Sequence, residues 1–102
     1  MRILKPGTVA GYAERHPAAS AALTRWLAVT RAADWSDHEA VRASYRSAVQ
    51  VKVATGAIVT VFNIAGNRFR LIVAIHYDRR IVFIRDFLTH AAYDKNRWKD
   101  QH

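Results

Sequence analysis

Residues 61–75 read VFNIAGNRFRLIVAI, and this stretch decides the fold. Two runs rich in β-branched and aromatic residues flank Gly66 and Asn67, a pair that is typical of the two-residue turn of a β-hairpin. The pattern predicts one strand at about residues 57–64 and a second strand at about residues 68–77. This hairpin is therefore the expected centre of an antiparallel sheet.

Further strands extend the hairpin on both sides. Asp78 and Arg79 predict a second tight turn, which leads to a strand at about residues 80–88. A shorter run at residues 49–53 predicts a weaker strand before the hairpin. Together these segments indicate a small antiparallel meander in the second half of the chain.

The first 46 residues are rich in alanine and have the apolar spacing of helices. We expect Thr8 to cap a helix that ends near His16, and Pro17 to begin a second helix. The sequence SDHE at residues 36–39 has the form of a capping box and predicts a third, short helix. The second helix has one apolar face at helical spacing, formed by Leu23, Trp26, Leu27 and Thr30.

Helices followed by a meander predict the α+β class, with the N-terminal helices packed on one face of the sheet. The 102 residues are expected to form one domain, residues 1–102, because two separate cores would each be too small to be stable. Trp26 and Trp35 are expected in the core rather than on a base-stacking surface. The chain has no run of about 18 apolar residues and no signal-peptide pattern, so we expect a cytoplasmic protein without membrane contact.

The charge of the chain points to an acidic partner. Sixteen Lys and Arg residues against eight Asp and Glu residues give a net charge of +8, which is typical of nucleic-acid binding. Residues 63–99 hold eight of these cations and only three Asp residues. A charged sheet face can be merely solvated, but such a face normally mixes both signs, so the excess favours an anion-binding site. The absence of cysteine excludes disulfide scaffolds, thiolate metal sites and cysteine nucleophiles.

Alternation along the second hairpin strand separates an apolar face from a basic face. With a two-residue turn, Asn63 lies opposite Arg70. The next turn then places Ile72 opposite Arg85, so that the two arginines are diagonal neighbours on an open face. The same register places Asp86 on the helix side. One extra residue in either turn would move some of these side chains to the opposite face of the sheet. The apolar face, which we expect against the helices, consists of Phe69, Leu71, Val73, Ile75 and Tyr77.

The run THAAYDK at residues 89–95 adds groups that can move a proton. RNA cleavage without a metal needs a base for the ribose 2′-hydroxyl, cations for the phosphate and an acid for the leaving oxygen. His90 and Tyr93 are three residues apart and share one side of a helical turn, and histidine serves as acid or base near neutral pH. We expect nearby arginines to lower the pKa of Tyr93. The alternative is that His90 is only a surface residue.

Other kinds of active site have no support in the sequence. The five His residues do not have the spacing of metal ligands, so no metal site is expected. There is no phosphate-binding glycine loop, dinucleotide fingerprint or nucleophile elbow.

Three strings resemble the HigB toxins of bacterial toxin–antitoxin systems, namely NIAGNRFRL at residues 63–71, IVFIR at residues 81–85 and THAAYDK at residues 89–95. The resemblance implies a RelE-like fold and a toxin that needs no metal or cofactor. It implies an mRNA interferase, an endoribonuclease that cuts messages on the translating ribosome and leaves a 2′,3′-cyclic phosphate. It also implies a HigA-type antitoxin with a helix-turn-helix domain, through which alone the toxin would meet operator DNA.

The resemblance and the basic face together define the candidate site. The run DFL at residues 86–88 departs from the family pattern, in which we expect a glycine before Thr-His. Two alternatives stay open, a non-catalytic basic module that binds RNA or DNA and an inactive toxin that acts with its antitoxin as a corepressor. The expected catalytic residues are His90, Tyr93, Arg70, Arg85 and Lys95. The expected RNA-binding residues are Asn63, Asn67, Arg68, His76, Arg79, Arg80, Arg97 and Lys99.

Overall fold

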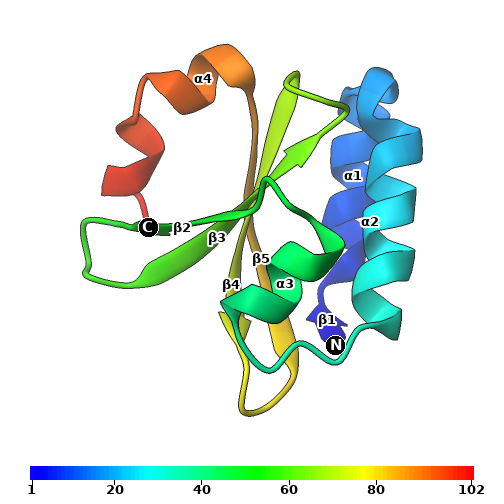
Figure 1. The fold of residues 1–102 in the computed structure, drawn as a ribbon. Coiled ribbons are helices and arrows are strands. Elements are labelled where there is room, and N and C mark those ends of the chain that lie inside the picture. The colour runs from blue at the N-terminus through cyan, green and yellow to red at the C-terminus, as the bar shows by residue number, and fades with distance from the viewer.

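Five strands form one sheet in the order β1-β5-β4-β3-β2 (Figure 1). The structure is a computed structural model that describes residues 1–102. Strands β2 to β5 are consecutive antiparallel neighbours, as the meander pattern predicts. The strands are β1 (Arg2–Leu4), β2 (Val49–Lys52), β3 (Ile58–Ile64), β4 (Phe69–His76) and β5 (Ile81–Thr89).

One strand was not expected from the sequence. β1 runs parallel to β5, with Ile3 beside Val82, so the sheet is mixed rather than wholly antiparallel. Three residues are too few to display the alternation that reveals a strand. The α+β prediction and the antiparallel meander are confirmed, and β1 adds a parallel strand at one edge that was not predicted.

The helices lie on both sides of the sheet (Figure 1). α1 (Pro6–Arg15) and α2 (Ser20–Ala32) lie side by side on one face, joined by the 3-10 turn η1 (Pro17–Ala19). α3 (His38–Ser44) contributes Val41 to the core beneath these helices. α4 (His90–Asp94) and the 3-10 turn η2 (Arg97–Asp100) lie on the side away from α1 and α2.

Three helix starts differ from the prediction: α2 begins at Ser20, after the 3-10 turn at Pro17, and the caps of α1 and α3 lie three residues and one residue from the expected positions. α1 begins with Pro6, so Thr8 lies inside the helix and is not its cap. Proline suits this first position because the missing N–H would have no partner there. α3 is capped by Asp37 rather than Ser36, since Oδ1 of Asp37 accepts a hydrogen bond from the Ala40 amide at 2.9 Å.

The larger core lies between the helices and the sheet and contains 15 buried residues. Trp26 and Trp35 both belong to it, and their rings lie 5.5 Å and 6.1 Å from the ring of Phe62. Leu71 and Val73 of β4 point into the same core. The predicted core positions of the two tryptophans and the predicted apolar face of β4 are confirmed.

A β-bulge changes the register of β5. The pairing follows a two-residue turn as far as Ile84, but Ile72 then pairs with Asp86. Arg85 is the extra residue, so the predicted pairing of Ile72 with Arg85 was wrong. Because side chains alternate along a strand, the extra residue turns Asp86 away from the helices and brings Phe87 into the core instead.

The sheet face away from α1 and α2 is covered rather than open. Ile72 is fully buried on this face. Trp98 of η2 is 3% exposed and lies against the same face, because the C-terminal segment folds back over the sheet (Figure 1). The expectation of an open face was wrong, since a single tryptophan in a polar run has no periodic signal. The second core consists of Val53, Val59, Val61, Ile72 and Trp98.

Candidate active site

The candidate site lies where the β3–β4 turn meets the start of α4. Thr89 ends β5 and caps α4, because its Oγ1 accepts a hydrogen bond from the Ala92 amide at 3.2 Å. The amide of His90 donates to the carbonyl oxygen of Arg68 at 3.0 Å. These two bonds bring the first turn of α4 against the β3–β4 turn.

Arg70 is the central cation of the site. It lies opposite Asn63, which confirms the predicted register of the first hairpin, and it is only 8% exposed. Its Nη1 donates to the carbonyl oxygens of Asn67 and Phe69, each at 3.1 Å, and its Nη2 lies 3.2 Å from Nδ1 of His90. A buried charge is costly unless its donors find partners. These bonds therefore explain why Arg70 tolerates burial here.

His90 lies between a cation and a carboxylate. Its Nε2 is 3.3 Å from Oδ2 of Asp94, one helical turn further along α4. A guanidinium only donates hydrogen bonds, and an ionised carboxylate only accepts them. This network assigns the proton of the neutral imidazole to Nε2 and directs the lone pair of Nδ1 toward Arg70. The side chain is 54% exposed, so a substrate can reach it.

Tyr93 lies one turn after His90 on α4 and contacts Arg70. The guanidinium carbon of Arg70 lies 5.5 Å from the centre of the Tyr93 ring, which is a cation–π distance. Burial raises the pKa of the Tyr93 phenol, Arg70 lowers it by less, and Asp94 raises it further. The expectation of a lowered pKa was wrong, because burial outweighs the arginine. The phenol is therefore protonated at neutral pH.

Arg85 lies elsewhere on the sheet. It lines a hollow of about 340 Å³ at the edge between β5 and β1, beside Leu4, Lys5 and Phe83. The predicted diagonal pairing of Arg85 with Arg70 was wrong, because it required β5 to have no bulge.

The other predicted residues are spread along the sheet and the C-terminal segment. β4 has eight residues, so its two ends are about 23 Å apart. Lys95 and Arg97 line a hollow with Asp86, and Arg70 is not among its lining residues. The Arg70 end of β4 carries Asn63, Asn67 and Arg68. The far end carries His76, Arg79 and Arg80, and the C-terminal segment carries Lys95, Arg97 and Lys99.

The far end of β4 has cations but no comparable cluster. Nε of Arg80 donates to Oδ1 of Asp34 at 2.5 Å, and its Nη1 donates to the carbonyl oxygen of Tyr77. The ring of His76 packs edge-on against Phe83, with ring centres 4.9 Å apart. Arg80 thus has its partners in Asp34 and Tyr77, His76 has an aromatic neighbour, and no arginine–histidine contact is formed at this end.

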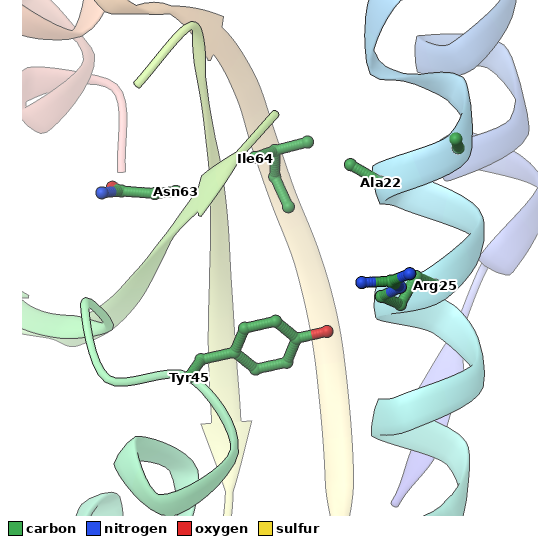
Figure 2. A pocket seen from close by; sticks show the side chains of 6 residues that line it. Ala22, Arg25, Tyr45, Asn63 and Ile64 are labelled. Atoms are coloured by element: carbon green, nitrogen blue, oxygen red, sulfur yellow. The ribbon is translucent and has the colours of Figure 1, made fainter. Parts of the chain in front are cut away.

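A further hollow, of about 280 Å³, lies between β3 and α2 (Figure 2). Tyr45 and Ile64 point toward α2, and Arg25 is the only charged residue on its walls. The side chain of Asn63 points away from α2, to the side of the sheet that carries α4 (Figure 2). The walls of the hollow carry one cation and one phenol but no histidine or carboxylate, and Asn63 belongs with the candidate site on the other face.

Sequence reasoning missed two residues of the site. Asp94 holds Nε2 of His90, and its signal was the four-residue spacing that puts two side chains on one helical face. The Trp98 ring stacks on Tyr93 at a centroid distance of 5.2 Å, and its Nε1 donates to the Tyr93 carbonyl oxygen at 3.1 Å. A large apolar side chain in a polar tail was the only sign of this anchor.

The structure has neither a cluster of metal ligands nor a membrane-spanning helix. No three His, Asp or Glu side chains gather into a group that could hold a metal ion. None of the helices combines the length and the hydropathy that a membrane span requires.

A comparison with known families identifies the chain. The profile of the HigB toxins, described as the RelE-like toxic component of a toxin-antitoxin system, matches residues 19–96. No curated protein sequence matched the chain. The matched range includes Arg70, His90, Tyr93 and Asp94 and ends before Trp98. The chain therefore belongs to the HigB toxin family, the RelE-like toxic components of toxin–antitoxin systems.

Proposed function

We propose that this toxin is an endoribonuclease that cleaves mRNA on the translating ribosome without using a metal ion. The observation that supports this most is the 3.2 Å approach of the Arg70 guanidinium to Nδ1 of His90, with the Tyr93 ring beside them. A phosphate-binding cation, a base and an acid are the three groups that such a cleavage needs.

The contacts support a separate role for each group. A phosphate that binds Arg70 draws the guanidinium away from Nδ1 of His90, which is then free to accept the proton of the ribose 2′-hydroxyl. Asp94 accepts from Nε2 and stabilises the imidazolium that forms, as an aspartate does in a catalytic triad. Tyr93 keeps its proton at neutral pH, which suits an acid that protonates the leaving 5′-oxygen.

The proposed step couples the attack on phosphorus to two proton transfers. The 2′-oxygen attacks the phosphorus as it loses its proton to His90, and the bond between phosphorus and the 5′-oxygen breaks as Tyr93 donates its proton. The products carry a 2′,3′-cyclic phosphate and a 5′-hydroxyl group. Lys95, which directly follows α4, adds positive charge next to this helix.

The family implies an antitoxin partner. We infer that it is a HigA-type protein with a helix-turn-helix domain, and that the toxin meets operator DNA only through it, in the cytoplasm. A toxin with a charge of +8 needs a partner with an acidic contact surface. Raising salt from about 0.05 M to about 0.5 M shortens the screening length severalfold, so it should speed dissociation of the complex. Dissociation that is indifferent to salt would contradict this charge pairing.

One observation favours a second candidate function. Both ring nitrogens of His90 are bonded to protein groups in the free structure, as in a purely structural network. A toxin that no longer cleaves would still bind its antitoxin and act as a corepressor, or bind RNA through its basic residues alone. In that case, each arginine removed would weaken RNA binding by a moderate step. The slope of the logarithm of the binding constant against the logarithm of the salt concentration would fall in magnitude by about one for each phosphate that the protein no longer neutralises.

The test is single-turnover cleavage of ribosome-bound message by the wild type, His90→Ala and Tyr93→Phe. A general acid or base contributes roughly 10²–10⁴-fold, so each variant should lose cleavage on that scale while it still binds the antitoxin. The ends of the fragments should be cyclic phosphates. If neither substitution slows cleavage by more than about tenfold, the proposed proton transfers are wrong. If the wild type does not cleave, the corepressor function is favoured.

A further inference from the structure

The family match ends at residue 96, but the C-terminal segment after it is tightly bound to the fold. The amide of Ala54 donates to the carbonyl oxygen of Lys99 at 3.0 Å. Oγ1 of Thr55 donates to the carbonyl oxygen of His102 at 2.8 Å, and Nε2 of His102 lies 3.2 Å from Oδ2 of Asp86. The segment therefore joins the β2–β3 loop to β5 across one face of the sheet.

Trp98 is the anchor of this segment. It is 3% exposed and packs in the second core with Val53, Val59 and Ile72. Its ring lies almost parallel to that of Tyr93, with an interplanar angle of 19° and a centroid distance of 5.2 Å. Its indole N–H donates to the backbone carbonyl oxygen of Tyr93 at 3.1 Å. The Trp98 side chain thus contacts both the ring and the backbone of Tyr93.

α4 cannot hold this position by itself. It has five residues, none of which is buried, and helices this short are unstable without tertiary contacts. Its N-terminus is fixed by the Thr89 cap and by the bond from His90 to Arg68, while its C-terminal end has Trp98 as its packing partner. The place of Tyr93 beside Arg70 therefore depends on Trp98.

We propose that Trp98 is a positioning residue, which lies outside the matched family range and holds Tyr93 and α4 against Arg70. The contacts run from Trp98 to Tyr93, from Tyr93 to Arg70, and from Arg70 to His90. This inference rests on the proposed function only for its effect on cleavage, because the place of Tyr93 can be measured without any RNA.

A matched control separates positioning from core stability. Val59 is buried in the same second core at 2% exposure, but it has no stacking or hydrogen-bond contact with Tyr93. Val59→Ala therefore weakens this core without removing the Tyr93 contact. Trp98→Phe keeps an aromatic ring against Tyr93 but loses the indole donor, whereas Trp98→Ala loses both.

The first readout is the titration of Tyr93, followed by NMR of toxin with ¹³C-labelled tyrosine rings and assigned with Tyr93→Phe. Trp98→Ala should move the pKa of Tyr93 down toward its ordinary value of 10.0, because the ring becomes exposed. Trp98→Phe and Val59→Ala should leave the Tyr93 pKa near that of the wild type. A Tyr93 pKa unchanged in Trp98→Ala would overturn the proposal, as would an equal change in Val59→Ala.

The second readout is cleavage of ribosome-bound message at a temperature where all variants are folded. Misplacing a catalytic group by about 1 Å costs ~10²-fold in rate, so Trp98→Ala should lower kcat on that scale and leave KM nearly unchanged. Trp98→Phe should recover most of kcat, and Val59→Ala should keep it. An equal loss of kcat in Trp98→Ala and Val59→Ala would mean that Trp98 acts only as a core residue. If the wild type fails to cleave, the proposed function fails, and the titration alone still decides the place of Tyr93.

Discussion

The two ends of β4 carry the same kinds of residue in different surroundings. One end has Arg70 and His90 in direct contact, with the arginine 8% exposed. The other end has Arg80 and His76, each bound to a different neighbour and with no proton-transfer partner. Composition alone therefore does not define the site. Burial and a shared contact turn an arginine and a histidine into a catalytic candidate.

Arg70→Ala should have the largest effect on this comparison. It removes the phosphate-binding cation, so cleavage should fall by roughly 10²–10³-fold, as when one oxyanion donor is removed. It also leaves one buried and one partly buried carbonyl acceptor without their donor, so the free energy of unfolding should fall by about 1–3 kcal/mol. Arg70→Lys keeps the charge but not the planar fork of donors and should recover little cleavage.

The control for Arg70→Ala is Arg79→Ala, at the other end of β4. Single-turnover cleavage and urea unfolding of both variants measure the difference. Equal losses of cleavage in the two variants would mean that the basic residues act only through their total charge. The central role of the Arg70 end would then be wrong.

The second prediction concerns pH and should be smaller. Burial raises the pKa of Tyr93 above its ordinary value of 10.0, so the folded protein holds this proton to higher pH than the unfolded chain does. The resulting stability is fully present below a pH of about 10 and is lost as the pH rises through the raised pKa. Tyr93→Phe removes this dependence. Urea midpoints at a pH of about 8 and about 11 should therefore differ less in Tyr93→Phe than in the wild type.

Tyr12, Tyr45 and Tyr77 also have pKa values raised by burial and provide the control for this pH test. They contribute the same dependence to both proteins, so it cancels in the comparison. A difference between the midpoints that is equal in the two proteins would place the Tyr93 ring in solvent.

The smallest effect is expected at the far end of β4. The pair of Arg80 and Asp34 is mostly exposed, with side-chain exposures of 39% and 83%. Exposed ion pairs contribute about 0–1 kcal/mol to stability, so Asp34→Ala should lower the unfolding free energy by no more than that. Arg80→Ala also removes the donor to the Tyr77 carbonyl oxygen and should cost somewhat more. Cleavage should change by less than about twofold, below the effect of any general acid or base. A large loss of cleavage in Arg80→Ala would place part of the site at this end.

Much of the fold could be predicted because its signals are local. The hairpin around Gly66, the apolar face of β4 and the buried tryptophans all follow from alternation, turn residues and spacing. The register of the first hairpin placed Asn63 opposite Arg70 correctly. The groups of the site that share this hairpin or α4 were found for the same reason.

The remaining features depend on tertiary contacts that leave no periodic pattern. The bulge at Arg85 inserts one residue into β5 without a local sequence signal. This residue exchanges the faces on which Asp86 and Phe87 lie. β1 is too short to display alternation. Trp98 covers the second face from a distant part of the chain, so the surroundings of Arg70 and the raised pKa of Tyr93 could not be derived from nearest neighbours.

The most direct test of the proposed site compares two exposed histidines that differ in surroundings. His90→Ala and His76→Ala each remove one exposed imidazole from opposite ends of β4, and both proteins should keep their fold and bind the antitoxin. In single-turnover cleavage of ribosome-bound message, His90→Ala should be slower than the wild type by roughly 10²–10⁴-fold, and His76→Ala should be within about threefold of it. If the two variants cleave at similar rates, the contact of Arg70 with His90 does not form the active site.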